Sequence, residues 1–109
     1  MSTTHQTRLE DGQLVTAFAG AMTFRDYGAT DALLEALFQR IGQEAGTVTG
    51  LVFDLAEVEM VDSHWLGFFV LALKRAQESN LGVVLRRPRP AVRRLFDLVQ
   101  FERVFTIEA

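Results

Sequence analysis

The sequence predicts a single α/β domain that spans residues 1–109. Its expected sheet is mixed and has four to five strands, which open as a hairpin and continue as parallel strands, with three to four helices. Three observations predict this fold class. A hairpin signal opens the chain, apolar runs alternate with helical patterns from residue 51 onward, and 109 residues is close to the common size of one domain.

The opening of the chain predicts a hairpin. Residues 4–10 are polar and tolerate an edge strand, and Asp11-Gly12 is a favourable two-residue turn. The run over 14–19, Leu-Val-Thr-Ala-Phe-Ala, suits a second strand. Gly20 is expected to break this second strand.

A loop over 21–28 is expected to precede the first helix. Thr30 or Asp31 can cap that helix, which runs through Ile41. Its apolar residues recur at spacings of three and four, so they should face the core. These residues are Leu33, Leu34, Leu37, Phe38 and Ile41.

A buried strand and a second helix form the centre of the chain. The run over 51–55 is continuously apolar except for Asp54, which is typical of a strand covered on at least one face. Residues 58–61 carry the chain to a helix that begins at Ser63 and ends near Ser79.

The last part of the chain predicts a strand, a helix and a short extended end. The next strand is expected over 82–86. Pro88 and Pro90 suit the start of a helix over 91–99, and 104–107 suits a final short strand. The inward residues of the last helix should be Val92, Leu95, Phe96 and Val99.

Composition excludes several classes of site. Cysteine is absent, which excludes disulfides and thiolate metal sites and fits a reducing compartment. His5 and His64 are the only histidines, so we expect no metal site and no cofactor. The N-terminus lacks an apolar signal segment, and the longest apolar run, 65–73, is too short to span a bilayer. We therefore expect a cytoplasmic protein.

The charge is unevenly distributed along the chain. The net charge is -3, yet residues 82–109 carry six arginines against three acids. This group could contact nucleic acid, but no aromatic residues are interleaved with the arginines. A solvated helix face that meets an acidic partner is the favoured interpretation, and nucleic acid is not expected as a partner.

The central helix is apolar on more than one side. With Leu66 as the centre of a projection at 100° per residue, the expected core stripe is Leu66, Phe69, Val70, Leu73 and Gln77. The opposite side holds His64, Phe68, Leu71 and Arg75, with Trp65 and Ala72 on its flank. A surface helix should be polar there, so we interpret this side as an exposed partner patch. Cover by the helix at 91–99 is the alternative.

Asp62 and Ser63 stand at the expected start of this helix. Either side chain can cap the free N–H groups of the first turn. Asp62, Ser63 and His64 do not predict a hydrolase, because consecutive side chains leave a helix 100° apart and cannot align as a triad. Enzymatic activity is therefore the least favoured function.

The segment LVFDLAEVEMVDSHWLG, with its downstream strand and helix, resembles the STAS domain of bacterial anti-sigma factor antagonists. Members of that family typically carry a strand ending in Asp, a short hydrophobic connection, and D-S-x-G-L-G opening a helix. The matching residues are Asp54, Asp62, Ser63, Leu66 and Gly67. His64 and Trp65 replace the usual small residue and glycine, which changes the surface that a partner must approach.

The resemblance implies a partner-switching function. The unphosphorylated protein would bind an anti-sigma factor, often a serine kinase with a histidine-kinase-like ATPase fold, and so release a sigma factor. Phosphorylation of Ser63 would block binding, and a serine phosphatase would restore it. The domain would act as a monomer or weak dimer. Candidate contact residues are Asp62, His64, Trp65, Phe68 and Leu71, with Thr23 at the rim.

The sequence leaves two alternatives open. Asp54 either lies near the phosphorylation site or has a purely structural role. The function could instead be that of a STAS accessory subunit in a lipid-transport or transporter assembly, with a nucleotide-binding sensor less favoured. The switch interpretation requires that the Ser63 hydroxyl is exposed and that the neighbouring aromatic side chains are not wholly covered by the chain itself.

Overall fold

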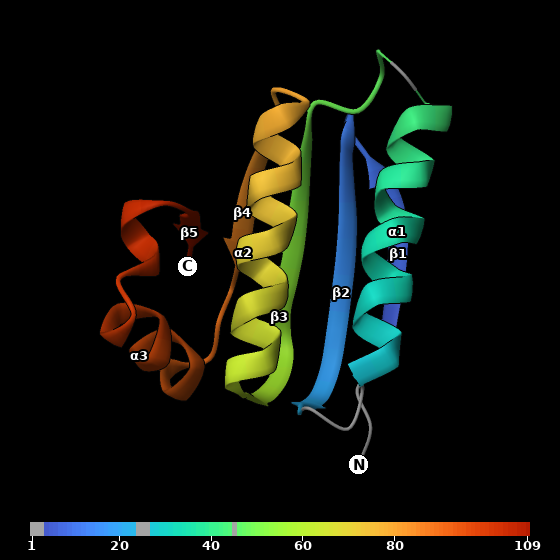
Figure 1. Ribbon diagram of the computed structural model, residues 1–109. Helices are drawn as coiled ribbons and strands as arrows, with labels where there is room; N and C mark the ends of the chain where they lie inside the picture. Colours follow the sequence, from blue (N-terminus) through green and yellow to red (C-terminus); the bar gives the residue numbers. More distant parts are fainter. Residues whose placement is uncertain (1–3, 24–26, 45) are drawn as a thin grey trace.

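The structure is a computed structural model that describes residues 4–23, 27–44 and 46–109. Its five-stranded sheet has the order β1-β2-β3-β4-β5, in which β1 and β2 are antiparallel and every later pair is parallel. Figure 1 shows α1 and α2 side by side on one face of the sheet. The predicted α/β class and mixed sheet are confirmed. The elements are β1 (Thr4–Glu10), β2 (Gln13–Met22), α1 (Tyr27–Gln43), β3 (Gly50–Val61), α2 (Ser63–Glu78), β4 (Gly82–Arg86), α3 (Pro90–Leu98), the 3₁₀-helix η2 (Phe101–Arg103) and β5 (Thr106–Glu108).

The opening hairpin follows from its turn residues. Asp11 and Gly12 have φ values of 50° and 80°. Positive φ at both central residues produces the twist that matches two antiparallel strands, which is why Asp-Gly is favoured there. The predicted hairpin is confirmed.

Two strands are longer than predicted. β2 continues past Gly20 to Met22, and β3 continues to Val61. The strands remain paired because β3 carries one extra residue at each of two register shifts, opposite Ala17–Ala19 and opposite Gly20–Ala21. The prediction that Gly20 breaks the second strand is therefore wrong.

The first helix also begins earlier than predicted. It starts at Tyr27, so Thr30 and Asp31 lie within it and neither is its cap. The loop predicted over 21–28 is wrong at both ends, which belong to β2 and α1, whereas residues 24–26 lie outside the described residues. The inward face of α1 is confirmed, because its five predicted residues are buried or pack against the core.

The core lies between the sheet and the helices and is rich in aromatic rings. Phe53 of β3 lies 5.7 Å from Phe68 and 5.4 Å from Phe69 of α2, measured between ring centroids. Phe69 also contacts Phe96 of α3, which joins the third helix to the same core. Val99 is 44% exposed, so its predicted inward position is wrong: it caps the end of α3, just after the last helical turn.

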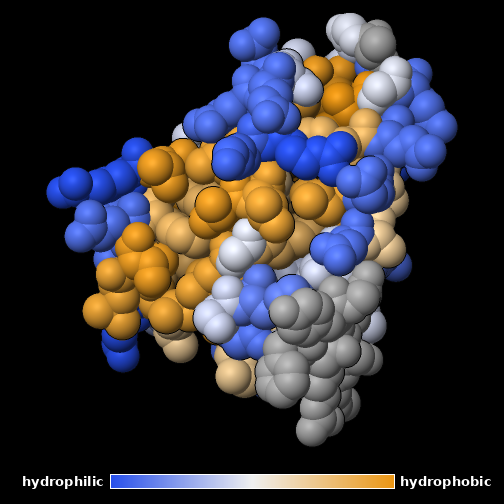
Figure 2. Space-filling view, in the orientation of Figure 1, coloured by the Kyte–Doolittle hydropathy of each residue, from blue (hydrophilic) through white to orange (hydrophobic). Residues whose placement is uncertain are grey.

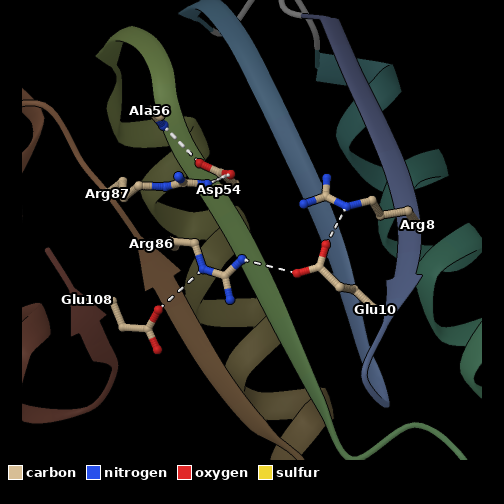
Figure 3. Close-up of polar contacts among 7 residues, drawn as sticks. All are labelled: Arg8, Glu10, Asp54, Ala56, Arg86, Arg87 and Glu108. Atoms are coloured by element: carbon tan, nitrogen blue, oxygen red, sulfur yellow. Dashed lines mark hydrogen bonds and ion pairs between the residues drawn. The ribbon is translucent and has the colours of Figure 1, made fainter.

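Ion pairs cross the face of the sheet opposite the helices (Figure 3). In β4, Arg86 Nε lies 3.2 Å from Glu108 Oε1 of β5, and Arg86 Nη1 lies 4.0 Å from Glu10 Oε1 of β1. Glu10 also pairs with Arg8. These long side chains lie across the sheet and bring charges from both of its edges together.

Candidate functional site

The first turn of α2 is held by a side-chain cap. Asp62 has extended backbone angles, and its Oδ1 accepts a hydrogen bond of 3.0 Å from the backbone N–H of Trp65. The backbone N–H of Asp62 donates to the Met22 carbonyl at the end of β2. Asp62 is therefore the cap, which leaves the adjacent Ser63 exposed in the first helical turn.

The buried face of α2 differs from the predicted one. Trp65 is 2% exposed and Phe68 is 3% exposed, whereas Val70, which was predicted to face the core, is 44% exposed. The predicted exposure of Trp65 and Phe68 is wrong. The buried stripe is centred on Trp65 instead of Leu66, a rotation of about 100°. Its members are Trp65, Phe68, Phe69, Ala72 and Ala76.

The aromatic packing explains this rotation. The Trp65 ring meets the edges of Phe18 at 5.5 Å and Phe68 at 5.0 Å between centroids. Its indole N–H donates a hydrogen bond of 3.0 Å to the Thr23 carbonyl. Trp65 therefore fills the core and ties Thr23 to the start of α2. Thr23 lies where a rim residue would, although its contact is made through its backbone.

A hollow of about 280 Å³ lies between α1 and α2, and Ser63 is on its border. Its lining is mostly apolar and consists of Thr30, Asp31, Leu34, Ser63, His64, Gly67, Phe68 and Leu71. Leu71 is 51% exposed, and Figure 2 shows that apolar atoms cover much of this face of the molecule. The hollow can accept an apolar group of a partner beside the Ser63 hydroxyl.

Contacts between the two helices fix the shape of this hollow. His64 Nε2 lies 2.8 Å from Thr30 Oγ1. Farther along, Arg75 of α2 lies over the Phe38 ring at 4.5 Å and pairs with Glu35 of α1 at 2.7 Å. Polar contacts therefore join α1 and α2 both at this hollow and farther along the two helices.

Asp54 has a different environment from the other candidates. It lies within β3 and not at its end, and its carboxylate accepts hydrogen bonds from the Ala56 backbone N–H and from the Arg87 guanidinium (Figure 3). Arg87 follows β4, so this pair ties β3 to the end of its neighbouring strand. These contacts favour the structural role for Asp54.

The structure thus places Asp62, Ser63, His64 and Thr23 at the start of α2, whereas Leu71 lies about two turns farther along and lines the same hollow as Ser63 and His64. Thr30, Asp31 and Leu34, which form the α1 wall of the hollow, were not predicted as site residues. The apolar spacing of α1 placed Leu34 on the core face, but it carried no signal that the polar Thr30 and Asp31 border α2.

Neither a metal-ligand cluster nor a membrane-spanning helix occurs within the described residues. No group of three or more His, Cys, Asp or Glu residues within them could hold a metal ion. In the same part of the chain, no helix is both long enough and apolar enough to cross a membrane.

The family model of the STAS domain matches residues 6–109. No curated protein matches the sequence.

Solved structures share the fold. An anti-sigma factor antagonist from Mycobacterium paratuberculosis is 25% identical, with a TM-score of 0.74 over 97% of this chain and 85% of the other. The anti-sigma factor antagonist SpoIIAA in its unphosphorylated form is 17% identical, with a TM-score of 0.77 over 97% and 89%. The phosphorylated form of SpoIIAA, a Bacillus cell fate determinant, is 16% identical, with a TM-score of 0.71 over 97% and 92%.

Proposed function

Because the chain belongs to the STAS domain family, we propose that it is an anti-sigma factor antagonist whose binding is switched by phosphorylation of Ser63. In this proposal the unphosphorylated protein binds an anti-sigma factor that is also a serine kinase, and a serine phosphatase reverses the modification. Similar structures support the proposal: one is an anti-sigma factor antagonist, and a second such antagonist, SpoIIAA, is known in an unphosphorylated and a phosphorylated form.

One observation carries the proposal: Ser63 is exposed in the first turn of α2, on the border of an apolar hollow. A kinase can reach a hydroxyl in this position without unfolding the domain. A partner that covers the hollow must also cover the hydroxyl. Modification and binding therefore compete for one surface.

The energetics of a phosphate fit a switch at this position. Phosphoserine carries about -1.5 to -2 charges at neutral pH. At a helix N-terminus it meets free N–H groups and the positive end of the helix dipole, worth ~0.3–1 kcal/mol, so the fold should tolerate it. Under an apolar partner the same charge would be desolvated, at a cost of several kcal/mol. Each ~1.4 kcal/mol weakens binding tenfold.

The contact residues in this proposal differ from those expected from sequence. Trp65 and Phe68 are not retained as a docking patch, because the chain itself covers them. The exposed apolar contacts are Val70 and Leu71 on α2. Asp62, His64 and Thr23 remain as polar neighbours of Ser63. The condition that the aromatic residues be uncovered is not met, so the proposal depends on the exposed serine and these smaller side chains.

Binding measurements test the proposal directly. The cognate anti-sigma factor is titrated with the wild type, Ser63→Ala, Ser63→Asp and Ser79→Asp. Ser79 is an exposed serine at the opposite end of the same helix and serves as the matched control. We expect Ser63→Asp to bind at least tenfold more weakly and the other variants to bind like the wild type. Equal affinity of all four proteins would reject the switch.

Modification is tested separately. Incubation with the host's serine kinases, followed by intact-protein mass spectrometry, should add one phosphate to the wild type and none to Ser63→Ala. A pull-down that recovers a transporter ATPase and no anti-sigma factor would favour the accessory-subunit function.

A further inference from the structure

The described residues that line the hollow beside Ser63 carry little positive charge. Among its lining residues the charged group is Asp31, and the Asp62 carboxylate stands at the helix start immediately before Ser63. Among the described residues, no lysine or arginine lines the hollow, and Arg75, farther along α2, is paired with Glu35. A phosphate on Ser63 would therefore add negative charge beside two existing carboxylates.

Among the described residues of the lining, His64 has a side chain that can gain a proton and a positive charge. It follows Ser63 in the chain and borders the same hollow. Its Nε2 lies 2.8 Å from Thr30 Oγ1, and its ring is 6.5 Å from that of Trp65. The Thr30 hydroxyl can donate to a neutral ring or accept from a protonated one. The contact between α1 and α2 can thus persist in both protonation states.

We propose that His64 is the counter-ion of phosphorylated Ser63, so that modification draws a proton onto the imidazole and the strength of the switch depends on pH. This inference rests on the proposed function, because it concerns the phosphorylated state. It also gives a role to one of the two residues at which the helix start departs from the family pattern.

The sign of the effect follows from the charges. A nearby negative charge favours the protonated imidazole, so the ring titrates at higher pH after modification. Histidine is the side chain that changes charge most readily in the physiological pH range, so a nearby phosphate can alter its protonation there. Below the shifted midpoint, the imidazolium cancels part of the phosphate charge. Phosphorylation should then weaken partner binding less at pH 6 than at pH 8.

The first test is a nuclear magnetic resonance titration of both histidines from pH 5 to 8.5. Phosphoserine is incorporated at position 63 during translation, so no kinase is needed. We expect the His64 midpoint to rise by about 0.5–1 pH unit relative to the unmodified protein. His5 is the internal control, because it lies on β1 against Phe18 and does not line the hollow. A His64 shift no larger than that of His5 would overturn the proposal.

The second test uses the reciprocity of linked titrations. The phosphorus resonance of phosphoserine is titrated in the wild type and in His64→Gln. If His64 is the counter-ion, the phosphate midpoint is higher in His64→Gln, since the variant lacks the imidazolium. Identical phosphate midpoints would also contradict the proposal.

The two proposals fail in different experiments. If no host kinase modifies Ser63, the proposed switch fails, whereas the titrations of the encoded phosphoserine protein are unaffected. If the titrations show no coupling while Ser63→Asp still weakens binding, the counter-ion role fails and the switch remains.

Discussion

Replacing Trp65 with alanine distinguishes a core residue from a docking residue. The side chain is 2% exposed, packs against Phe18 and Phe68, and donates a hydrogen bond to the Thr23 carbonyl. Removal of a buried tryptophan costs about 3–5 kcal/mol, because the transfer free energy is lost and a cavity remains. Since a domain is stabilised by about 5–15 kcal/mol, this is a large fraction of its stability.

Leu71→Ala is the matched comparison on the same helix. Its side chain is 51% exposed and borders the hollow, so its truncation should cost less than about 1 kcal/mol of stability. It should instead weaken binding of the anti-sigma factor. The two substitutions are thus expected to affect different measurements.

Urea unfolding followed by far-ultraviolet circular dichroism measures both variants. Tryptophan fluorescence is unsuitable because Trp65 is the only tryptophan in the chain. We expect the midpoint of Trp65→Ala to fall strongly at an unchanged slope, and that of Leu71→Ala to fall slightly. A loss below about 1 kcal/mol for Trp65→Ala would refute its assignment to the core and restore it as a candidate docking residue.

Three further predictions concern the same structure. Asp62→Ala should lower the free energy of unfolding by about 1 kcal/mol through loss of the helix cap, and Asp62→Asn should retain most of it, both measured by urea unfolding. Ser63→Asp should leave the free energy of unfolding within about 0.5 kcal/mol of the wild type, because a carboxylate is tolerated in the first turn of a helix. A large loss would mean that the hydroxyl is packed, not exposed. Asp54→Ala should lower the free energy of unfolding by about 1–3 kcal/mol, since the Ala56 N–H and Arg87 lose their acceptor. It should leave affinity for the anti-sigma factor unchanged, and a selective loss of affinity would place Asp54 in the docking surface.

Local signals were sufficient for much of the fold. Asp-Gly predicted the hairpin because its two residues accept positive φ, and the start of α2 was predicted from a residue pair that can cap a helix. The ends of β2 and β3 were not predicted, because no local sequence signal marks them. Ala56 to Met60 lack a continuous apolar run, and they remain in the sheet through pairing with β2 across two register shifts.

The sequence predicted where the site lies in the chain, but not which side of α2 is buried. The sequence of α2 carries apolar side chains on more than one side, so periodicity alone allowed a stripe centred on Leu66 or on Trp65. Phe18 of β2 and Phe53 of β3 determine which side of α2 is buried. Phe18 packs against Trp65, and Phe53 packs against Phe68. Asp54 was uncertain for a similar reason, since its partner Arg87 lies 33 residues away in the chain.

The order of the strands bears on how the protein is made. Each strand lies beside the one that precedes it in the chain, from β1 at one edge to β5 at the other. No strand must be inserted between two that are already joined. As the chain leaves the ribosome, every new strand can therefore add to an edge that already exists, and the sheet can assemble from the N-terminus onward while synthesis continues.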